Sequence, residues 1–454
     1  MPDRARVSAF VILTTVGALV AAAPAGAQAP SELEVRCDAG DGLEAALGSI
    51  ETGGRILLRS GVCTGNFSIT RAVRIQGEGL DRVTLQAADP ARPVVQISAG
   101  ITVKVSGVTI RGGHIGVSTV GRIEMTFSTV ADNTDAGIEI RDGGMLVTDR
   151  VLVTRNVGSG VRIINGEAAI SGSVISKNVT DRAGGAGVLV VGGRVEIAMT
   201  RFDENESVND GGGLLATRKG IVVLDRVRFF RNTTRVGQGG GIALRGSTAD
   251  ITASSFFENA ADTGNGGGIA VLDKSELRLT NTTLASNVAS FSFPSSPGGS
   301  GGGMHVDRTS TASLVHATLV NNSARLAAGI ASLNTVTMQA TLLAGNLGAV
   351  EPGECGGSGR IASQGWNLVL DPGACRFIAR PGDLLGASPL LGPYGTYGGA
   401  WNTVPLRSAS PAIDRVPADL CRLAVDQRLR PRTTPAGKRC AIGAFERQPD
   451  DVIP

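Results

Sequence analysis

The side chains able to transfer protons or bind anions are few and fall into two small groups. The sequence contains three histidines, His114, His305 and His316. The first group is Glu139, Arg141 and Arg162, whose guanidinium groups suit an anionic ligand. A solvated ion pair among these side chains is the simpler explanation of the group. The other combines an imidazole with a nearby carboxylate and a more distant cation: His305, Asp307 and Arg245. Both groups are predicted as candidate ligand-binding residues, and no catalytic residue is predicted.

A glycoside-cleaving site is the catalytic alternative, and the spacing of the residues argues against it. Asn133-Thr134-Asp135 resembles a motif of polygalacturonases. Such a hydrolase needs further carboxylates close by, but one repeat later stand Gly158-Ser159. Glu139 and His305 are six repeats apart, roughly 29 Å at ~4.8 Å per repeat, too far for an acid–base pair. Nucleophile-elbow, phosphate-loop and zinc-ligand spacings do not occur, so neither a cofactor nor a metal is predicted.

Two columns of residues recur through the middle of the chain and must position these side chains. The first is a column of asparagines, each preceded at three residues by an apolar side chain: Asn133, Asn156, Asn178, Asn205, Asn232, Asn259, Asn287, Asn322 and Asn346. The second is a glycine followed by alternating apolar positions, as in Gly137-Ile138-Glu139-Ile140. Each glycine precedes the next asparagine by 17 to 19 residues, whereas each asparagine precedes the next glycine by 4 to 16. Nearly all insertions therefore fall in one corner of the repeat.

This spacing predicts an all-β, single-stranded parallel β-helix over residues 54–350, with about three short strands in each rung. The asparagines are expected to adopt the left-handed turn conformation and to hydrogen-bond from rung to rung. Residues 28–53 are expected to cap the N-terminal end, where Asp41-Gly42-Leu43-Glu44 resembles a capping box opening a helix to about Ile50. Residues 351–446 are expected to cap the other end, followed by a tail over 447–454.

The N-terminal segment and the cysteines predict folding outside the cytoplasm. Arg4 and Arg6 precede an apolar run that ends in Ala25-Gly26-Ala27, so residues 1–27 are predicted to be a cleaved signal peptide. Six cysteines in an oxidising compartment predict disulfides with 15 conceivable pairings. Proximity in the sequence favours Cys37 with Cys63, Cys355 with Cys375, and Cys421 with Cys440. The protein is expected to be secreted, periplasmic or at the cell surface.

Several ordered motifs resemble known families. Phe202-Asp203-Glu204-Asn205, Phe229-Phe230-Arg231-Asn232 and Phe256-Phe257-Glu258-Asn259, alternating with Gly-Gly-Gly tracts, resemble polymorphic outer membrane protein repeats. Gly365-Trp366-Asn367-Leu368, Ser410-Pro411-Ala412-Ile413-Asp414, Asp426-Gln427-Arg428 and Ile442-Gly443-Ala444-Phe445-Glu446 resemble the choice-of-anchor Q domain. The first resemblance implies a right-handed β-helix of the pectin-lyase-like class, at a surface or secreted. The second implies a domain at residues 351–446.

Composition limits the partners. The net charge of +3 gives no field that gathers nucleic acid, and no stretch after residue 30 is apolar enough to span a membrane. Both tryptophans and both tyrosines follow residue 360, so the solenoid has no Trp or Tyr side chain on which sugar rings could stack. The sequence favours a secreted, non-catalytic interaction or adhesion protein. Its partner, a polysaccharide or a cell-surface protein, would meet the inserted loops at 179–186, 206–212, 233–240, 260–267 and 288–302. The alternatives are a polysaccharide lyase or glycoside hydrolase, and a structural envelope or matrix component.

Overall fold

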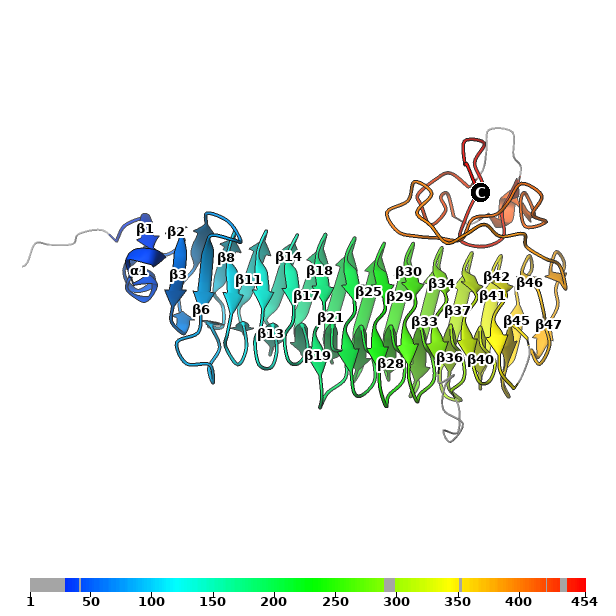
Figure 1. The fold of residues 1–454 in the computed structure, drawn as a ribbon, viewed down its shortest axis with the longest axis horizontal. Helices are drawn as coiled ribbons and strands as arrows, with labels where there is room; N and C mark the ends of the chain where they lie inside the picture. Colours follow the sequence, from blue (N-terminus) through cyan, green and yellow to red (C-terminus); the bar gives the residue numbers. More distant parts are fainter. Residues whose placement is uncertain (1–28, 41, 290–298, 351–352, 422, 433–438) are drawn as a thin grey trace, which may run out of the picture.

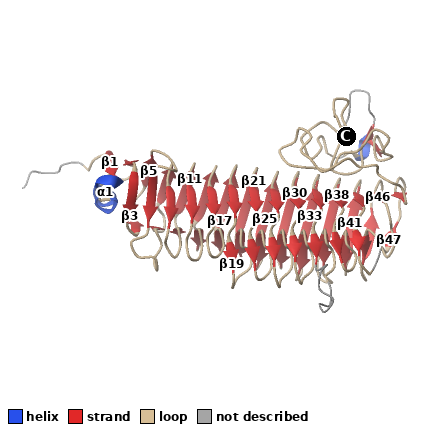
Figure 2. Ribbon diagram, viewed as in Figure 1, coloured by secondary structure: helices blue, strands red, loops and turns tan. Residues whose placement is uncertain are grey.

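The computed structural model describes residues 29–454 except 41, 290–298, 351–352, 422 and 433–438. The chain forms a long rod of stacked rungs with a smaller C-terminal region along one side (Figure 1). Apart from short helical turns, the rod consists of strands and loops (Figure 2). The predicted parallel β-helix is confirmed. The predicted signal peptide, residues 1–27, lies outside the described residues.

Within a full rung the chain passes through sheet 1, sheet 2, a short corner sheet and sheet 3, and strands pair in parallel with those of the next rung. Sheet 1 contains β1 (Glu32–Arg36), β2 (Arg55–Arg59), β5 (Val73–Gly77), β8 (Thr102–Ser106), β11 (Arg122–Thr126), β14 (Met145–Asp149), β17 (Glu167–Ser171), β21 (Arg194–Ala198), β25 (Ile221–Asp225), β29 (Thr248–Thr252), β33 (Glu276–Thr280), β37 (Thr311–Val315), β41 (Thr335–Gln339), β45 (Arg360–Ser363) and β47 (Phe377–Ile378). Sheet 2 contains β3 (Gly61–Thr64), β6 (Val83–Gln86), β9 (Thr109–Arg111), β12 (Thr129–Ala131), β15 (Leu152–Thr154), β18 (Val174–Ser176), β22 (Arg201–Asp203), β26 (Arg228–Phe230), β30 (Ser255–Phe257), β34 (Thr283–Ala285), β38 (Thr318–Val320), β42 (Leu342–Ala344), β46 (Leu368–Val369) and β48 (Leu384–Leu385).

Sheet 3 contains β4 (Phe67–Ile69), β7 (Val95–Ile97), β10 (Val117–Thr119), β13 (Ile138–Arg141), β16 (Val161–Ile164), β20 (Val188–Val191), β24 (Leu214–Thr217), β28 (Ile242–Arg245), β32 (Ile269–Leu272), β36 (Met304–Val306), β40 (Ile330–Ser332) and β44 (Cys355–Gly356). The corner sheet contains β19 (Val179–Thr180), β23 (Glu206–Ser207), β27 (Thr233–Thr234), β31 (Ala260–Ala261), β35 (Val288–Ala289), β39 (Ser323–Ala324) and β43 (Leu347–Gly348). The rungs before β19 have the three predicted strands, and the corner sheet adds a fourth strand to each rung from β19 to β43. The strands of this sheet occupy the insertions, which are therefore stacked on one another.

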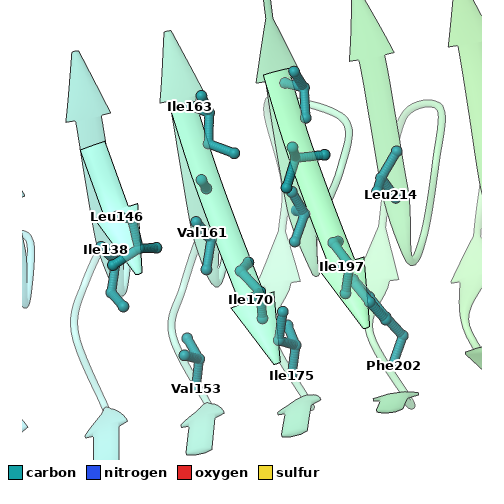
Figure 3. Close-up of a cluster of buried hydrophobic side chains, with 14 of the residues drawn as sticks. Ile138, Leu146, Val153, Val161, Ile163, Ile170, Ile175, Ile197, Phe202 and Leu214 are labelled. Atoms are coloured by element: carbon teal, nitrogen blue, oxygen red, sulfur yellow. The ribbon is translucent and has the colours of Figure 1, made fainter. Parts of the chain in front are cut away.

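The core is a set of columns of apolar side chains that run along the inside of the rod (Figure 3). The positions in the column that includes Ile170 and Ile197 alternate with exposed or partly exposed positions along these strands, so one face of each strand is buried. Phe202, Phe229 and Phe256 stack in register, with ring centroids 4.5 and 4.7 Å apart. Each apolar side chain is covered by its counterparts above and below, so neighbouring rungs stabilise each other.

The asparagine column is confirmed as a buried hydrogen-bonded ladder. From Asn133 to Asn346, each side-chain Nδ2 donates to the Oδ1 of the next asparagine at 2.8 to 3.0 Å. The ladder ends at the buried carboxylate of Glu354, which accepts from Asn346 Nδ2 at 2.5 Å. The predicted left-handed asparagine is wrong, because the left-handed residue is the one before it, as with Arg231 at φ 52°. The amides are thereby directed into the rod, where they bond to each other and to backbone carbonyls.

The N-terminal end carries the predicted short helix, α1 (Leu43–Ser49), beside a 3₁₀ turn, η1 (Cys37–Ala39). The N-cap of the helix is Gly42, which has no side chain to cap it, and the predicted capping box depends on Asp41. Asp41 lies outside the described residues. Burial of Leu43 and Leu47 against the core stabilises this helix.

The three disulfides form as sequence proximity favoured: Cys37–Cys63, Cys355–Cys375 and Cys421–Cys440. Strand pairing continues past residue 350, through β44 to β48, so the rod ends at about Leu385. Residues 387–454, with the antiparallel pair β49 (Val416–Pro417) and β50 (Arg439–Cys440) and the turn η2 (Ala418–Leu420), lie along sheet 2. This region extends back along the rod at least as far as Arg226, whose carbonyl accepts a hydrogen bond from Trp401 Nε1 at 2.5 Å. It therefore covers one side of the rod as well as following its last rungs.

Candidate functional site

A cleft of about 550 Å³ opens where the corner sheet begins. We call it the step cleft, and its lining is His114, Thr134, Asp135, Val157, Gly158, Arg162, Thr180, Asp181, Arg182 and Ala183. The floor comes from the short corners of successive rungs, in which Asn133 and Asn156 precede their glycines by only four residues. The next corner is longer, and its residues 180–183 form a ledge beside the floor. The cleft thus follows directly from the change in corner length.

Arg162 on β16 organises the floor of the step cleft. Its Nη1 and Nη2 donate to the two carboxylate oxygens of Asp135 at 2.8 and 2.5 Å, and Nη1 also donates to Glu139 at 3.0 Å. Arg141 Nε donates to the other oxygen of Glu139 at 2.6 Å. Burial disfavours the charge of Arg162, but its hydrogen bonds to Asp135 and Glu139 outweigh burial and raise its pKa above the ordinary value. Arg162 is therefore a fixed cation that orients Asp135.

The first predicted group, Glu139, Arg141 and Arg162, is thus brought together by the fold. The expected solvated ion pair is wrong, because the side chain of Glu139 is 2% exposed and that of Arg162 is 16% exposed. The outward positions of sheet 3 become buried along the rod because the corner loops fold over them. Leu189, Leu215 and Ala243 pack there in a small apolar cluster of their own.

The fold brings together His114 and Asp135, although the spacing of carboxylates in the sequence argued against a catalytic role for Asp135. His114 Nε2 lies 3.7 Å from Asp135 Oδ2, and the backbone N–H of Asp135 donates to the carbonyl of His114 at 2.8 Å. The side chain of His114 is 49% exposed and lines the cleft. Gly158 lies beside them at φ 146°, and a Cβ there would lie 2.2 Å from the carbonyl oxygen of Asp135. Only glycine permits this close approach of adjacent corners.

The second predicted group is a structural network of ion pairs and hydrogen bonds. Arg245 binds Asp210 and, at 2.6 Å, Asp273. Asp307 accepts from the backbone N–H of Asp273 at 2.7 Å. His305 is 6% exposed with Nδ1 3.1 Å from Ser300 Oγ, and burial lowers its pKa to about 4 while Asp307 opposes that shift. These residues hold neighbouring rungs together.

The inserted loops predicted as the interaction surface are ordered, within the part that the structure describes. The N–H of Gly239 donates to the carbonyl of Asn265 at 3.0 Å, and the N–H of Gly266 donates to that of Ser300 at 3.0 Å. Residues 290–298 of the last loop lie outside the described residues. The loops form a continuous fourth face, and the step cleft lies at the end of that face.

The step cleft offers hydrogen-bond donors and acceptors in fixed positions and no aromatic ring other than imidazole. The described residues hold no group of three or more histidine, cysteine, aspartate or glutamate side chains placed to bind a metal ion. No helix in the described part of the chain has the length and apolarity needed to cross a membrane. The arrangement suits a ligand with many hydroxyl groups, which would exchange hydrogen bonds with charged side chains.

Likeness to known proteins is confined to the fold. A family model described as a right-handed β-helix region matches residues 175–346. No curated protein sequence matches the chain. Among solved structures, pectate lyase Pel9A is similar, with 12% identity, a TM-score of 0.36 and coverage of 92% of this chain and 96% of that chain. The Agl-KA catalytic domain is similar, with 11% identity, a TM-score of 0.26 and coverage of 78% of this chain and 68% of that chain. The family match agrees with the parallel strand pairing.

Proposed function

We propose that this protein is a non-catalytic, extracellular β-helix protein that binds a short segment of saccharide in the step cleft. The observation that carries the proposal is the convergence of His114, Asp135 and Arg162 on one cleft of about 550 Å³. This volume is within the range of small-molecule sites, about 300 to 1,000 Å³. The ion pair between Arg162 and Asp135 fixes the floor before a ligand arrives, which lowers the entropic cost of binding.

Two side chains on the rim are available to a ligand. Arg182 is 92% exposed and lies 3.9 Å from Asp181. Val157 is 58% exposed and offers an apolar contact for the C–H face of a sugar ring. Together with His114 they provide the polar and apolar contacts that a saccharide needs without an aromatic platform.

A carbohydrate-cleaving enzyme is the second candidate, favoured by the imidazole of His114 beside Asp135. A glycosidase acid must present a proton to the leaving group. Both oxygens of Asp135 accept hydrogen bonds from Arg162, and Glu139 is buried between Arg141 and Arg162. Neither carboxylate is free for that role, and a further one in the lining, Asp181, is 74% exposed on the rim beside Arg182, so the geometry favours binding.

The extracellular location is also part of the proposal. Its support is the three disulfides, which persist in oxidising compartments, and the signal-like residues 1–27. The resemblances to polymorphic outer membrane protein repeats and to the choice-of-anchor Q domain favour a surface or secreted protein of the pectin-lyase-like class.

The test is a screen of neutral and acidic oligosaccharides for binding, followed by calorimetry with the best ligand. His114→Ala and Arg182→Ala are each expected to weaken binding at least tenfold. Arg278→Ala is the matched control, because Arg278 is 62% exposed on sheet 1 and outside the cleft, and no change is expected. Equal affinity in all three variants would refute the step cleft as the site. Release of reducing ends or unsaturated products, lost in His114→Ala, would establish the enzymatic alternative.

A further inference from the structure

The step cleft carries as many negative as positive side chains. Its lining contains two carboxylates, Asp135 and Asp181, and two guanidinium groups, Arg162 and Arg182. The imidazole of His114, which is charged only if protonated, lies 3.7 Å from Asp135. The carboxylates and guanidinium groups of the lining therefore sum to zero, without the surplus of positive charge that attracts an anionic ligand.

The guanidinium group at the floor of the cleft is already bonded to carboxylates of the protein. Arg162 donates to both oxygens of Asp135 and also to Glu139. Glu139 in turn accepts from Arg141 Nε and Nη2 at 2.6 and 3.1 Å. A ligand carboxylate at the floor would have to displace Asp135, whose side chain is 26% exposed, and would leave that carboxylate without its cation. Separating a partly buried charge from its partner is costly, so the floor disfavours an acidic group.

The rim of the cleft has the same arrangement in contact with solvent. Asp181 and Arg182 are adjacent in the sequence, their charged groups lie 3.9 Å apart, and their side chains are 74% and 92% exposed. A ligand carboxylate that approached Arg182 would therefore also approach Asp181. A ligand carboxylate beside His114 would face Asp135 in the same way. Because like charges a few ångströms apart repel even at a protein surface, the carboxylates of the lining oppose an acidic ligand at the floor and at the rim.

A hydroxyl group of a ligand meets no such opposition, since it both donates and accepts hydrogen bonds. It can donate to a carboxylate of the lining and accept from Arg182 or from a ring nitrogen of His114. A carboxylate oxygen accepts more than one hydrogen bond, so Asp135 can bind a hydroxyl while it stays paired with Arg162. Two neighbouring hydroxyls on one sugar ring can thus use an acceptor and a donor of the cleft together.

We propose that the step cleft selects neutral sugars and disfavours uronic acids and other acidic sugars. This preference rests on the proposed function, binding of a saccharide in the step cleft, and adds to it the class of saccharide. It arises from repulsion of the acidic class and not from stronger contacts with the neutral class. The sequence left an anionic ligand open, because Arg141 and Arg162 suit one, but both guanidinium groups bind carboxylates of the protein.

Matched pairs of oligosaccharides test this preference. The members of a pair differ only at C6, which is a hydroxymethyl group in the neutral sugar and a carboxylate in the uronate. Oligomers of galactose and galacturonate, of glucose and glucuronate, and of mannose and mannuronate are such pairs. In calorimetry with the purified protein at neutral pH, the neutral member of a pair that binds is expected to bind about tenfold more tightly or better. Methyl esterification of the uronate removes its charge and should restore most of the lost affinity.

Asp181→Asn tests whether the carboxylates of the cleft cause the preference. The change removes one negative charge from the rim, so affinity for the uronate is expected to rise about threefold or more while affinity for the neutral member changes less. Asp250→Asn is the matched control, because Asp250 is 55% exposed on sheet 1 and outside the cleft, and neither affinity should change. If Asp181→Asn left the ratio of the two affinities unchanged, the rim carboxylate would not be a cause of the preference and the proposal would be overturned.

The calorimetric outcomes separate this proposal from the proposed function. Equal binding of both members, or tighter binding of the uronates, would overturn the preference and leave the step cleft as a saccharide site. Binding by no member of any pair would overturn the proposed function and the preference with it. Tighter binding of the neutral members, with a ratio that falls in Asp181→Asn and not in Asp250→Asn, would support both.

Discussion

The asparagine ladder allows a sharp prediction for Asn232→Ala, near the middle of the rod. Asn232 is fully buried, and its Oδ1 accepts from the backbone N–H and the Nδ2 of Asn205 at 3.1 and 2.9 Å. Its Nδ2 donates to the carbonyl of Phe202 at 2.8 Å and to Asn259 Oδ1 at 3.0 Å. Alanine removes all four hydrogen bonds and leaves the Asn205 N–H without its side-chain acceptor.

The magnitude follows from the groups left unpaired. An unsatisfied buried donor or acceptor costs about 1 to 3 kcal/mol. Because Asn205 Nδ2 keeps the carbonyl of Ile175, at 2.9 Å, the unpaired groups are mainly the Asn205 N–H and the Phe202 carbonyl. For these two groups together, the free energy of unfolding should therefore fall by about 2 to 6 kcal/mol.

The assay is urea unfolding followed by circular dichroism, with an unchanged m value required for the comparison. Thr233→Ala is the control, because Thr233 is the neighbouring residue and half-buried, and a change below about 0.5 kcal/mol is expected. If Asn232→Ala lost no more stability than this control, the ladder would not stabilise the rod.

Other changes test separate features of the fold. Phe229→Ala removes the central ring of the stack. The free energy of unfolding should fall by about 3 to 5 kcal/mol in the same urea assay. A fall of less than about 1 kcal/mol would show that the neighbouring rings close over the gap. Reduction of Cys355–Cys375 should lower stability by about 3 kcal/mol, and a melting temperature unchanged by reductant would contradict this. Gly158→Ala places a Cβ against the carbonyl of Asp135 and should abolish ligand binding in calorimetry with the rod still folded; retained affinity would count against the cleft geometry.

The fold was largely predictable because its determinants repeat. The distance from glycine to asparagine is nearly constant over many rungs, which is incompatible with independent globular units. The same spacing predicted that the asparagines stack, as they do in the buried ladder. The left-handed position before each asparagine was missed because residues of many kinds occupy it, such as Asp132, Lys177 and Ser286. The corner sheet was missed because each of its strands has only two residues, too few for an alternating pattern.

The site was less predictable because it depends on contacts between rungs that lie outside the repeated columns. The rung containing His114 precedes the first asparagine of the ladder, so His114 lies outside both repeated columns. Pairing of Thr109–Arg111 with Thr129–Ala131 places His114 beside Thr134 and Asp135, and that 20-residue step was the available signal. The burial of Glu139 depended on the two arginines that pair with it, and that of His305 on contacts such as the one with Ser300, which no local pattern reveals.

The step cleft is formed by three short corners beside one long corner, and this origin makes its size adjustable in evolution. Each rung contacts mainly its neighbours, so duplication or loss of one short rung would leave the rest of the stack intact. Such an event would lengthen or shorten the floor by one strand spacing, ~4.8 Å, while the ledge kept its shape. In a lineage carrying this scaffold, the length of the cleft, and with it the length of ligand that fits, can therefore change in fixed steps of one strand spacing.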